Sequence, residues 1–441
     1  MRLIFLYSCN TVKTELTIIN SDGTSKVLDI GEDIYLSKEQ LPPEKYNGKE
    51  MEIVFAGYGI TADNYNYDDY KEIDVNGKVV LLQSGIPSMN DESISEGDKK
   101  KFGERSYKFD NAKMHGAAGV LVIPGERILR YWGFMKKRAL SPSISLLNND
   151  EADKNAIPVV FLSEQSVKDL LSDERNSYDE ILEASENNKP LLGFNLTKKI
   201  IFNYRTNLEI KEARNVIGIV EGTDEELKNE YIVLSAHYDH EGIVNDEIYN
   251  GADDNGSGTV AILEAGRRLA LLKENKRSII IAFHTGEEKG LLGSKYLTKN
   301  SDFMSEVVSN INIDMVGRED TDSIYSIGSG KLSTELYDLV EKVNSETVKF
   351  ELDYTFDDPN DPNKYYYRSD HYNYAKQNIP IVFFYDHMTE DYHKPTDDVE
   401  KINFEKIEKV STLITELALR IANLDHKLKL DKKVEGTMLT D

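Results

Sequence analysis

Carboxylates and histidines recur in the second half of the chain at the ends of apolar runs. The stretch FHTGEEKGLLGS, residues 283–294, places Glu287 and Glu288 side by side directly after one such run. Two adjacent carboxylates repel each other unless a positive charge lies beside them. Carboxylates accept and return protons, and together with histidines they bind divalent metals. The pair therefore points to a metal-dependent reaction.

The same kind of donor follows several other apolar runs. A loop, GADDNGSG at 251–258, adds further carboxylates before a predicted helix. Because ligands in open α/β sheets gather at the carboxyl ends of strands, we expect all these side chains to meet. The donors are His237 and Asp239 after YIVLSAH, Glu287 and Glu288 after RSIIIAFHT, Asp314 in NINIDMVG, and Tyr392 and His393 after IPIVFFYD.

The composition of this set indicates which metal it suits. Two histidines with several carboxylates and no thiolate fit zinc, or a similar divalent ion, in a hydrolytic site. A single ion would leave carboxylates to spare, whereas two ions bridged by one carboxylate use them all. Each residue taken alone has an ordinary explanation, and Asp254 could simply cap the helix that follows it.

The elements that position these donors read as an α/β domain between about 206 and 425. Continuous Ile/Val runs alternate with stretches predicted to be helices at about 259–273, 291–299 and 404–423. Strands that are apolar on both faces are typical of a mainly parallel sheet covered by helices. We therefore predict a three-layer α/β sandwich with a mainly parallel, mixed central sheet.

The preceding part of the chain has a different texture. Residues 46–205 contain short β-type runs, such as MEIVFAGYGI and GKVVLLQSG, with one helix predicted at about 108–116. This pattern predicts a small β-rich domain. We expect residues 1–45 to form a segment that packs on the α/β domain, and residues 426–441 to form a polar tail.

The bulk composition excludes some classes of function. The 441 residues include 53 basic and 78 acidic side chains, a net charge of −25, which argues against binding nucleic acid or anionic lipid. No apolar run approaches the ~20 residues that span a bilayer. The single cysteine, Cys9, allows no intrachain disulfide. Its stretch, MRLIFLYSCN, is expected to be a first strand rather than an export signal.

Several competing readings are weaker. The chain has no H-E-x-x-H and no G-x-S-x-G motif, and the stretch around Gly328 departs from a phosphate loop. The acidic loop at 353–363 and the tyrosines at 64–70 and 365–374 are read as surface or packing features rather than as calcium or substrate sites. Six histidines are left as structural or surface residues: His115, His240, His284, His371, His387 and His426.

The motifs HYDH, GADDNGSG, TGEEKGLLGS, NIDMVGR, YRSDHYNYAKQNIP and DYHKPTDD, in this order, resemble the di-zinc aminopeptidase family. Its members include bacterial leucyl-type aminopeptidases and aminopeptidase Y, and its relatives include glutamate carboxypeptidase II and the transferrin receptor. Between 46 and 205, FAGYGI and AKMHGAAGVLVIPG resemble the protease-associated domain that is often inserted in these enzymes. The expected fold is that of the zinc exopeptidases.

The resemblance implies a role for each donor. One zinc would be bound by His237, Asp254 and Asp314, and the other by Asp254, Glu288 and His393, so that Asp254 bridges two Zn²⁺ ions. Glu287 would be the general base, and Asp239 would hydrogen-bond the His237 ring. Tyr392 would help to stabilise the oxyanion.

The implied activity is removal of the N-terminal residue from peptides that have a free amino group. Two alternatives stay open: a carboxypeptidase or dipeptidase of the same family, for which Arg318 and Arg368 are the candidate carboxylate binders, and a non-catalytic receptor-like homologue. Because members of this family are usually exported, the resemblance favours export, although the sequence shows no complete signal peptide. The sequence predicts neither the oligomeric state nor the preferred N-terminal residue.

Overall fold

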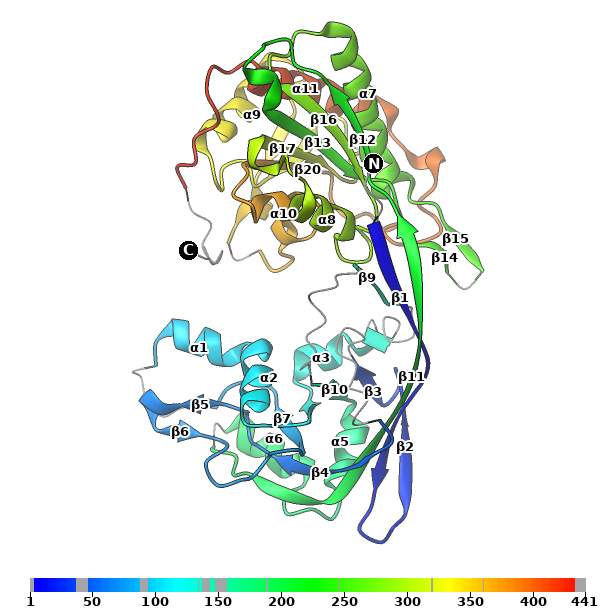
Figure 1. The fold of residues 1–441 in the computed structure, drawn as a ribbon, viewed down its shortest axis with the longest axis vertical. Coiled ribbons are helices and arrows are strands. Elements are labelled where there is room, and N and C mark those ends of the chain that lie inside the picture. Colours follow the sequence, from blue (N-terminus) through cyan, green and yellow to red (C-terminus); the bar gives the residue numbers. More distant parts are fainter. Residues whose placement is uncertain are drawn as a thin grey trace. The chain divides into compact units, whose positions relative to one another are not determined.

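The structure is a computed structural model that describes residues 4–36, 47–87, 94–133, 135–136, 143–146, 157–187, 189–244, 246–318, 320–359 and 361–432. The chain forms two compact units (Figure 1). The larger unit comprises Met1–Leu6 and Lys211–Asp441, and the smaller unit comprises Tyr7–Ile210.

The larger unit is built on a seven-stranded sheet in the order β12-β16-β13-β17-β20-β18-β19. Strands β16, β13, β17 and β20 pair in parallel, while β12 and β18 run antiparallel to their neighbours β16 and β20. The sheet is therefore mixed and mainly parallel. The strands are β12 (Val216–Val220), β13 (Tyr231–His237), β16 (Ser278–His284), β17 (Val307–Ile313), β18 (Ser323–Ile327), β19 (Glu351–Asp353) and β20 (Ile381–Tyr385).

Helices cover both faces of this sheet and make the three predicted layers (Figure 1). On one face, Leu234 of β13 shares a core with α7 (Gly258–Leu272), α9 (Thr334–Glu346) and α11 (Phe404–Ala422). On the other face, Val233 packs with α8 (Leu292–Asn300) and α10 (His371–Ala375). Neighbouring residues of β13 thus enter opposite cores, because successive side chains of a strand point to opposite faces.

The predicted elements of the larger unit agree with the observed ones to within a few residues. Some elements had not been predicted: β18, β19, α9 and the hairpin of β14 (Gly242–Val244) and β15 (Glu247–Tyr249). These strands have three to five residues each and mix polar with apolar side chains, so they give little periodic signal.

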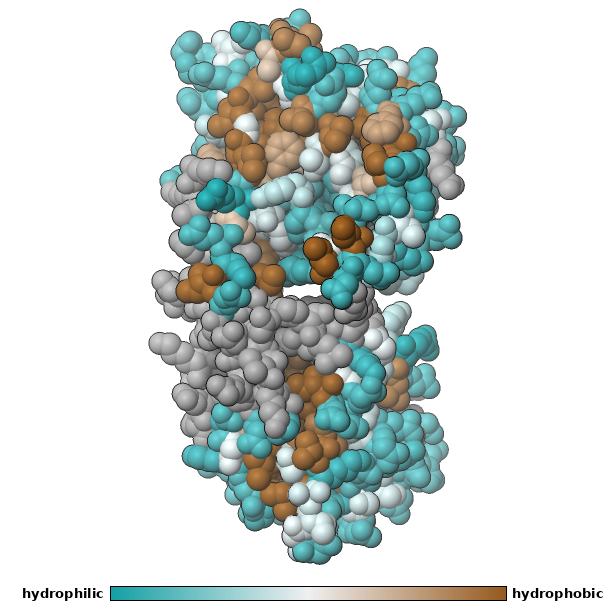
Figure 2. All heavy atoms as spheres, turned by 90° about the vertical axis from the view of Figure 1, so that its right-hand side faces the viewer, coloured by the Kyte–Doolittle hydropathy of each residue, from teal (hydrophilic) through white to brown (hydrophobic). Residues whose placement is uncertain are grey.

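Strand β12 is at the end of the sheet, and its apolar side chains are exposed. Ile219 is 62% exposed, and Val216 and Ile217 are also exposed. Figure 2 faces the side of the molecule on which Figure 1 draws β12 and α7, and it shows apolar side chains gathered on this unit. Among the described helices, none is long and apolar enough to cross a bilayer.

The smaller unit contains a nine-stranded sheet whose main path is β2-β1-β11-β4-β7-β8-β10-β3. Its parallel centre consists of β4, β7, β8 and β10, and helices pack around it. The strands are β1 (Ile4–Ile19), β2 (Ser25–Asp29), β3 (Ile34–Leu36), β4 (Glu50–Phe55), β7 (Val79–Gln83), β8 (Gly119–Ile123), β9 (Ser143–Leu146), β10 (Val159–Leu162) and β11 (Phe194–Ala213). The helices are α1 (Glu96–Gly103), α2 (Arg105–Met114), α3 (Glu126–Arg130), α5 (Glu164–Leu171) and α6 (Tyr178–Glu186).

Two features of the smaller unit differ from the expectations. Its described residues include helices α1, α3, α5 and α6 besides the expected one, α2. The N-terminal segment, expected on the α/β domain, joins the smaller unit from Tyr7 onward. The physical reason is strand pairing: β2 pairs with β1, and β3 pairs with β10 at the edge of the sheet. Buried Leu28 and Ile34 then belong to the core of this unit.

Candidate metal centre

The donors predicted from the sequence lie together at the carboxyl ends of adjacent strands. Strands β16, β13 and β17 are neighbours in the sheet and run in parallel, so their last residues reach the same edge. His237 is the last residue of β13, Asp314 directly follows β17, and Glu287 follows β16 by three residues. The topology therefore gathers side chains that are far apart in the sequence.

The first cluster consists of His237, Asp254 and Asp314. The Nε2 atom of His237 lies 3.3 Å from Oδ1 of Asp254 and 3.3 Å from Oδ1 of Asp314. All three residues are buried. Oδ2 of Asp314 accepts a hydrogen bond of 2.7 Å from the Ser369 hydroxyl, which orients the carboxylate.

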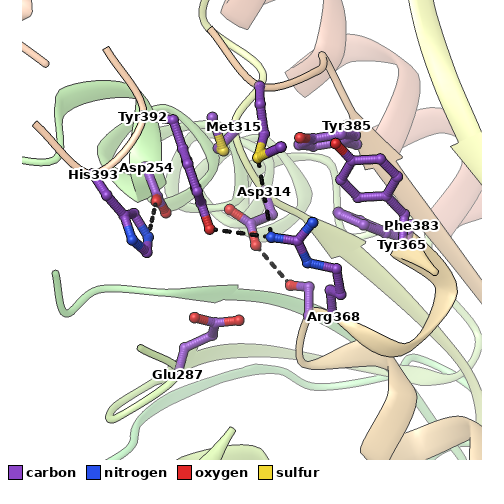
Figure 3. Close-up of a pocket in the computed structure, with 12 residues that line it drawn as sticks. Asp254, Glu287, Asp314, Met315, Tyr365, Arg368, Phe383, Tyr385, Tyr392 and His393 are labelled. Atoms are coloured by element: carbon purple, nitrogen blue, oxygen red, sulfur yellow. Dashed lines mark hydrogen bonds and ion pairs between the residues drawn. The ribbon is translucent and has the colours of Figure 1, made fainter. Parts of the chain in front are cut away.

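The second cluster lies on the other side of Asp254. Nε2 of His393 is 3.3 Å from Oδ2 of Asp254 and 3.0 Å from Oε2 of Glu288. Asp254 thus turns one carboxylate oxygen to each cluster, which is the arrangement that a bridging ligand needs. Figure 3 shows His393 and Asp254 facing each other beside the pocket.

The geometry fits a divalent cation in each cluster. Zinc bonds of 2.0–2.1 Å in a tetrahedron hold neighbouring ligand atoms about 3.3 Å apart, close to the distances above. Nε2 of His393 and Oε1 of Glu288 are also buried without a hydrogen-bond partner in the described part of the chain. Buried polar atoms without partners cost free energy, so a cation beside them would remove that cost.

The turn that carries Asp254 is held by charged residues from two other motifs. The carboxylate of Asp397 accepts hydrogen bonds from the backbone amides of Asp253 and Asp254, each at 3.1 Å. Arg318 pairs with Asp397 and lies 3.5 Å from Asp253 Oδ2. Asp253 itself accepts from the Gly317 amide at 2.8 Å. These contacts occupy Asp253 and leave Asp254 to face the donors.

The electrostatics reflect an excess of buried negative charge. Burial lowers the pKa of His393, but the carboxylates of Asp254 and Glu288 raise it to about 10. Burial also lowers the pKa of His237, and Asp314 and Glu287 outweigh this effect and raise it well above its ordinary value. Without a cation, the histidines therefore hold protons, and a metal must displace them to bind.

Glu287 lies at the edge of the first cluster. Its Oε2 atom is 4.0 Å from Nε2 of His237, and burial raises the pKa of its carboxyl well above the ordinary range. Its backbone amide donates a hydrogen bond of 3.2 Å to the Asp239 carboxylate. In Figure 3, Glu287 lies across the pocket from Tyr392 and His393. This position suits a group that exchanges a proton with a molecule in the pocket.

Asp239 contacts His237 through a different atom from the one expected. Nδ1 of the ring lies 3.0 Å from the backbone carbonyl oxygen of Asp239, whereas the carboxylate oxygen is 3.9 Å away. The carboxylate instead accepts the hydrogen bond from the Glu287 amide. Asp239 therefore connects the loops after β13 and β16, and its carbonyl can fix the tautomer of His237.

A pocket opens beside the first cluster and encloses about 360 Å³, open solvent included. The ring of Tyr392 stacks on His393, with 3.9 Å between ring centroids. The guanidinium of Arg368 lies 3.5 Å from the Tyr392 hydroxyl, as Figure 3 shows. The rest of the wall is largely apolar and aromatic: Met315, Tyr365, Phe383, Tyr385 and Met388.

Two residues of the second cluster were not predicted from the sequence. Nδ1 of His240 lies 2.8 Å from Oε1 of Glu288, whereas the sequence predicts a structural or surface role for this histidine. Glu241 lies with its Oε1 atom 3.9 Å from Nδ1 of His393. The only sequence signal for a role of these two residues in the site was their closeness to His237 in the HYDHE stretch. Among the described residues, the groups able to hold an ion all contain these strand-end donors, and none comes from the 353–363 loop.

The other histidines lie outside the two clusters. His284 is buried against the Tyr374 hydroxyl at 3.1 Å, and burial lowers its pKa to about 3. His371 is buried against the Tyr366 carbonyl, while His115 stacks on Tyr70. Two further histidines have ordinary contacts: His387 with Phe356, and His426 with Asp425 and Glu335.

Comparison with known proteins gives a family match within each unit. Residues 215–418 match Peptidase family M28, and residues 49–170 match the PA domain. Residues 215–418 therefore form an M28-family region, and residues 49–170 form a PA domain. The matched M28 region contains all eight predicted site residues, and the larger and smaller units are called the M28 unit and the PA unit below.

Individual relatives are distant. Leucine aminopeptidase 2 of Trichophyton equinum is 27% identical over 352 residues, which cover 76% of this chain and 58% of that protein. Aminopeptidase YwaD of Bacillus subtilis (strain 168) is 27% identical over 396 residues, which cover 85% of this chain and 70% of that protein. The chain thus spans less than two-thirds of the leucine aminopeptidases that it matches.

The fold has a counterpart among solved structures. An aminopeptidase from Aneurinibacillus sp. strain AM-1 aligns with a TM-score of 0.56 and 19% identity, covering 98% of this chain and 86% of that one. At this identity the likeness supports the fold and not the specificity.

Proposed function

We propose that the M28 unit is a zinc-dependent aminopeptidase that uses two ions. The observation that carries the proposal is the position of Asp254, whose two carboxylate oxygens each face a separate donor cluster at 3.3 Å. His237 and Asp314 complete the first site, and Glu288 and His393 belong to the second. Bound zinc would act as a Lewis acid and lower the pKa of a coordinated water.

The chain's own residues supply the proton transfers. Glu287 is placed to take a proton from the attacking water and to return it to the leaving amine. Its Oε2 atom lies 4.0 Å from Nε2 of His237, at the edge of the first cluster, where the attacking water would be held. The Tyr392 hydroxyl faces the pocket and can donate a hydrogen bond to the oxyanion as it forms.

Substrate preference follows from the wall of the pocket. The buried carboxylates around the clusters favour a substrate whose free amino group lies beside them. Met315, Phe383 and Met388 line the other side, so a large apolar N-terminal side chain fits there. Peptides with leucine or methionine at the N-terminus are therefore the expected substrates.

The carboxypeptidase alternative loses one of its two candidate residues. Arg318 is buried and paired with Asp397, and it also supports Asp253, so it cannot reach a substrate. Arg368 lines the pocket, but a single guanidinium is a weak basis for carboxylate specificity. The receptor-like alternative lacks support as well, because the expected ligands are present and lie together.

The proposal is tested with leucyl-anilide and with its N-acetylated form. We expect the purified chain to cleave the free form only, to lose activity with a chelator, and to regain it with zinc. Full activity after exhaustive removal of metal would exclude the proposal. Cleavage of N-blocked peptides from their carboxyl end would favour the carboxypeptidase alternative instead.

A further inference from the structure

His240 lies in the second cluster but has no role in the proposed function. Its Nδ1 atom is 2.8 Å from Oε1 of Glu288 and 3.8 Å from Oδ2 of Asp254. Only 7% of its side chain is exposed. Its ring meets that of His393 edge to face, with 5.6 Å between centroids. His240 therefore belongs to the same enclosed space as the donors of the second site.

The contact between His240 and Glu288 brings an imidazole nitrogen against a carboxylate oxygen in a buried space. Both nitrogens of His240 and Oε1 of Glu288 are buried without a hydrogen-bond partner in the described part of the chain, although two of these atoms are only 2.8 Å apart. Nε2 of His393 has no such partner either. Imidazole nitrogens and carboxylate oxygens that converge on one buried space are arranged like ligands around a cation.

The backbone holds His240 in this place from two sides. The Tyr238 amide donates to the His284 carbonyl at 3.0 Å, which ties the segment after β13 to the neighbouring strand. On the other side, a Cβ atom at Gly251 would lie 2.5 Å from Cγ of His240 and 2.4 Å from the Asp254 carbonyl oxygen. Gly251 has φ +65° and no side chain, so the ring can pack against the turn that carries Asp254.

We propose that His240 is a metal ligand of the second site, through Nδ1, beside Asp254, Glu288 and His393. This inference rests on the proposed two-metal function. Four protein ligands close a zinc site, whereas three leave a position for water. The second site would then be the closed, tighter one. The first site, where His237, Asp254 and Asp314 lie beside Glu287, would keep a position for water.

The two sites can be separated with variants. Asp314→Asn weakens the first site and leaves a chain that binds one ion at the second. Adding His240→Asn to this variant should then lower its affinity for the remaining ion by more than about 100-fold. Loss of an outer hydrogen-bonding partner lowers metal affinity by only about 10–100-fold. Zinc affinity is measured by competition with a chromophoric chelator, and cobalt absorption bands report the lost nitrogen ligand. His426→Asn, at an exposed histidine of the same unit, is the matched control.

Each outcome is decisive. A loss of 100-fold or less, or unchanged cobalt bands, would overturn the ligand assignment. If the wild-type chain itself binds no ion, the proposed function fails. If the wild-type chain binds two ions and the His240 substitution leaves zinc affinity unchanged, only the present inference is rejected. Should circular dichroism show that the Asn variant is unfolded, His240→Gln, whose side chain is longer, replaces it in the same measurement.

Discussion

The two units of this chain both contain parallel strands, but they differ in the residues at the carboxyl ends of those strands. In the M28 unit, β13, β16 and β17 lead into histidine and carboxylates that face one another. In the PA unit, β7 leads into Ser84, whose hydroxyl donates to the Ile123 carbonyl, and β10 leads into Ser163, which caps α5. Similar strand arrangements thus gather metal-type donors in one unit and form ordinary turns and caps in the other.

Buried charges show the same contrast. In the PA unit, the ammonium of Lys198 donates to the carbonyls of Asp169 and Leu170, and Asp69 accepts from the amides of Tyr58 and Ile60. Backbone groups therefore satisfy these charges. In the M28 unit, the carboxylates face histidines and each other, and some buried atoms have no partner among the described residues. A charge satisfied by the backbone supports the fold, whereas an unsatisfied cluster implies a ligand.

The strongest test of this contrast is Glu287→Gln. The amide cannot accept the water's proton, so we expect turnover of leucyl-anilide to fall by about 10²–10⁴-fold. The substitution keeps the shape of the side chain and removes no expected ligand, so zinc content should not change. Glu288→Gln is the matched control, because it should lower zinc content as well. A near-normal rate in Glu287→Gln would rule out Glu287 as the base.

Metal removal should affect one unit and spare the other. A ligand at 1,000 times its Kd stabilises the folded state by about 4 kcal/mol. Removal of the metal takes away this stabilisation and also leaves the carboxylates of the M28 unit repelling one another. Hydrogen exchange in the chelated chain should then accelerate at 237–240, 253–255 and 286–288. The amides of β7 and β8 should be unchanged. Equal acceleration in both units would contradict the assignment of the metal centre to the M28 unit.

The buried Asp69 predicts a pH effect confined to the PA unit. Burial raises the pKa of its carboxyl from 3.8 to about 6. Since the folded pKa exceeds the unfolded one, the folded chain holds the proton between about pH 4 and 6. Raising the pH through this window therefore lowers the free energy of unfolding, by up to about 3 kcal/mol.

This effect can be followed through Trp132, the only tryptophan of the chain, which lies in the PA unit. Its indole donates to the Gly31 carbonyl at 3.1 Å, so its fluorescence reports unfolding of that unit. Urea titrations at pH 4, 5 and 6 should show the loss in the wild-type chain and a flatter profile in Asp69→Asn. Parallel profiles of the two proteins would refute the prediction.

The smallest expected effect concerns Ser369. Its hydroxyl donates to Oδ2 of Asp314 and accepts from the Asn312 amide at 2.9 Å, so it orients an expected ligand. Ser369→Ala should weaken zinc binding about tenfold, at the low end for such outer partners. Ser305→Ala, at an exposed serine of the same unit, should leave zinc affinity unchanged. An unaltered affinity in Ser369→Ala would mean that the backbone bond from Asp314 to the Phe384 carbonyl positions this ligand well enough alone.

Much of the M28 unit could be predicted because its signals are local. The apolar runs that became β13, β16, β17 and β20 are continuous, and α11 was expected at 404–423 and is Phe404–Ala422. The N-terminal segment was placed on the wrong unit, because strand pairing between distant segments leaves no trace in local periodicity. The sequence predicts no site role for His240 for a similar reason, since nothing in its own stretch shows that Glu288 lies beside it.

The sequence by itself determined which donors exist, and it placed His237, Glu287, Glu288 and Asp314 at strand ends. This was possible because an apolar run followed directly by polar residues is a local pattern that the sequence shows. Only the tertiary structure decided how these donors are distributed between the two clusters. It turned the two oxygens of Asp254 to separate clusters, occupied Asp253 and Arg318 with each other and with Asp397, and brought His240 beside Glu288. The physical reason is that bridging, pairing and burial depend on distances between residues far apart in the sequence, which only the packed sheet and its loops fix.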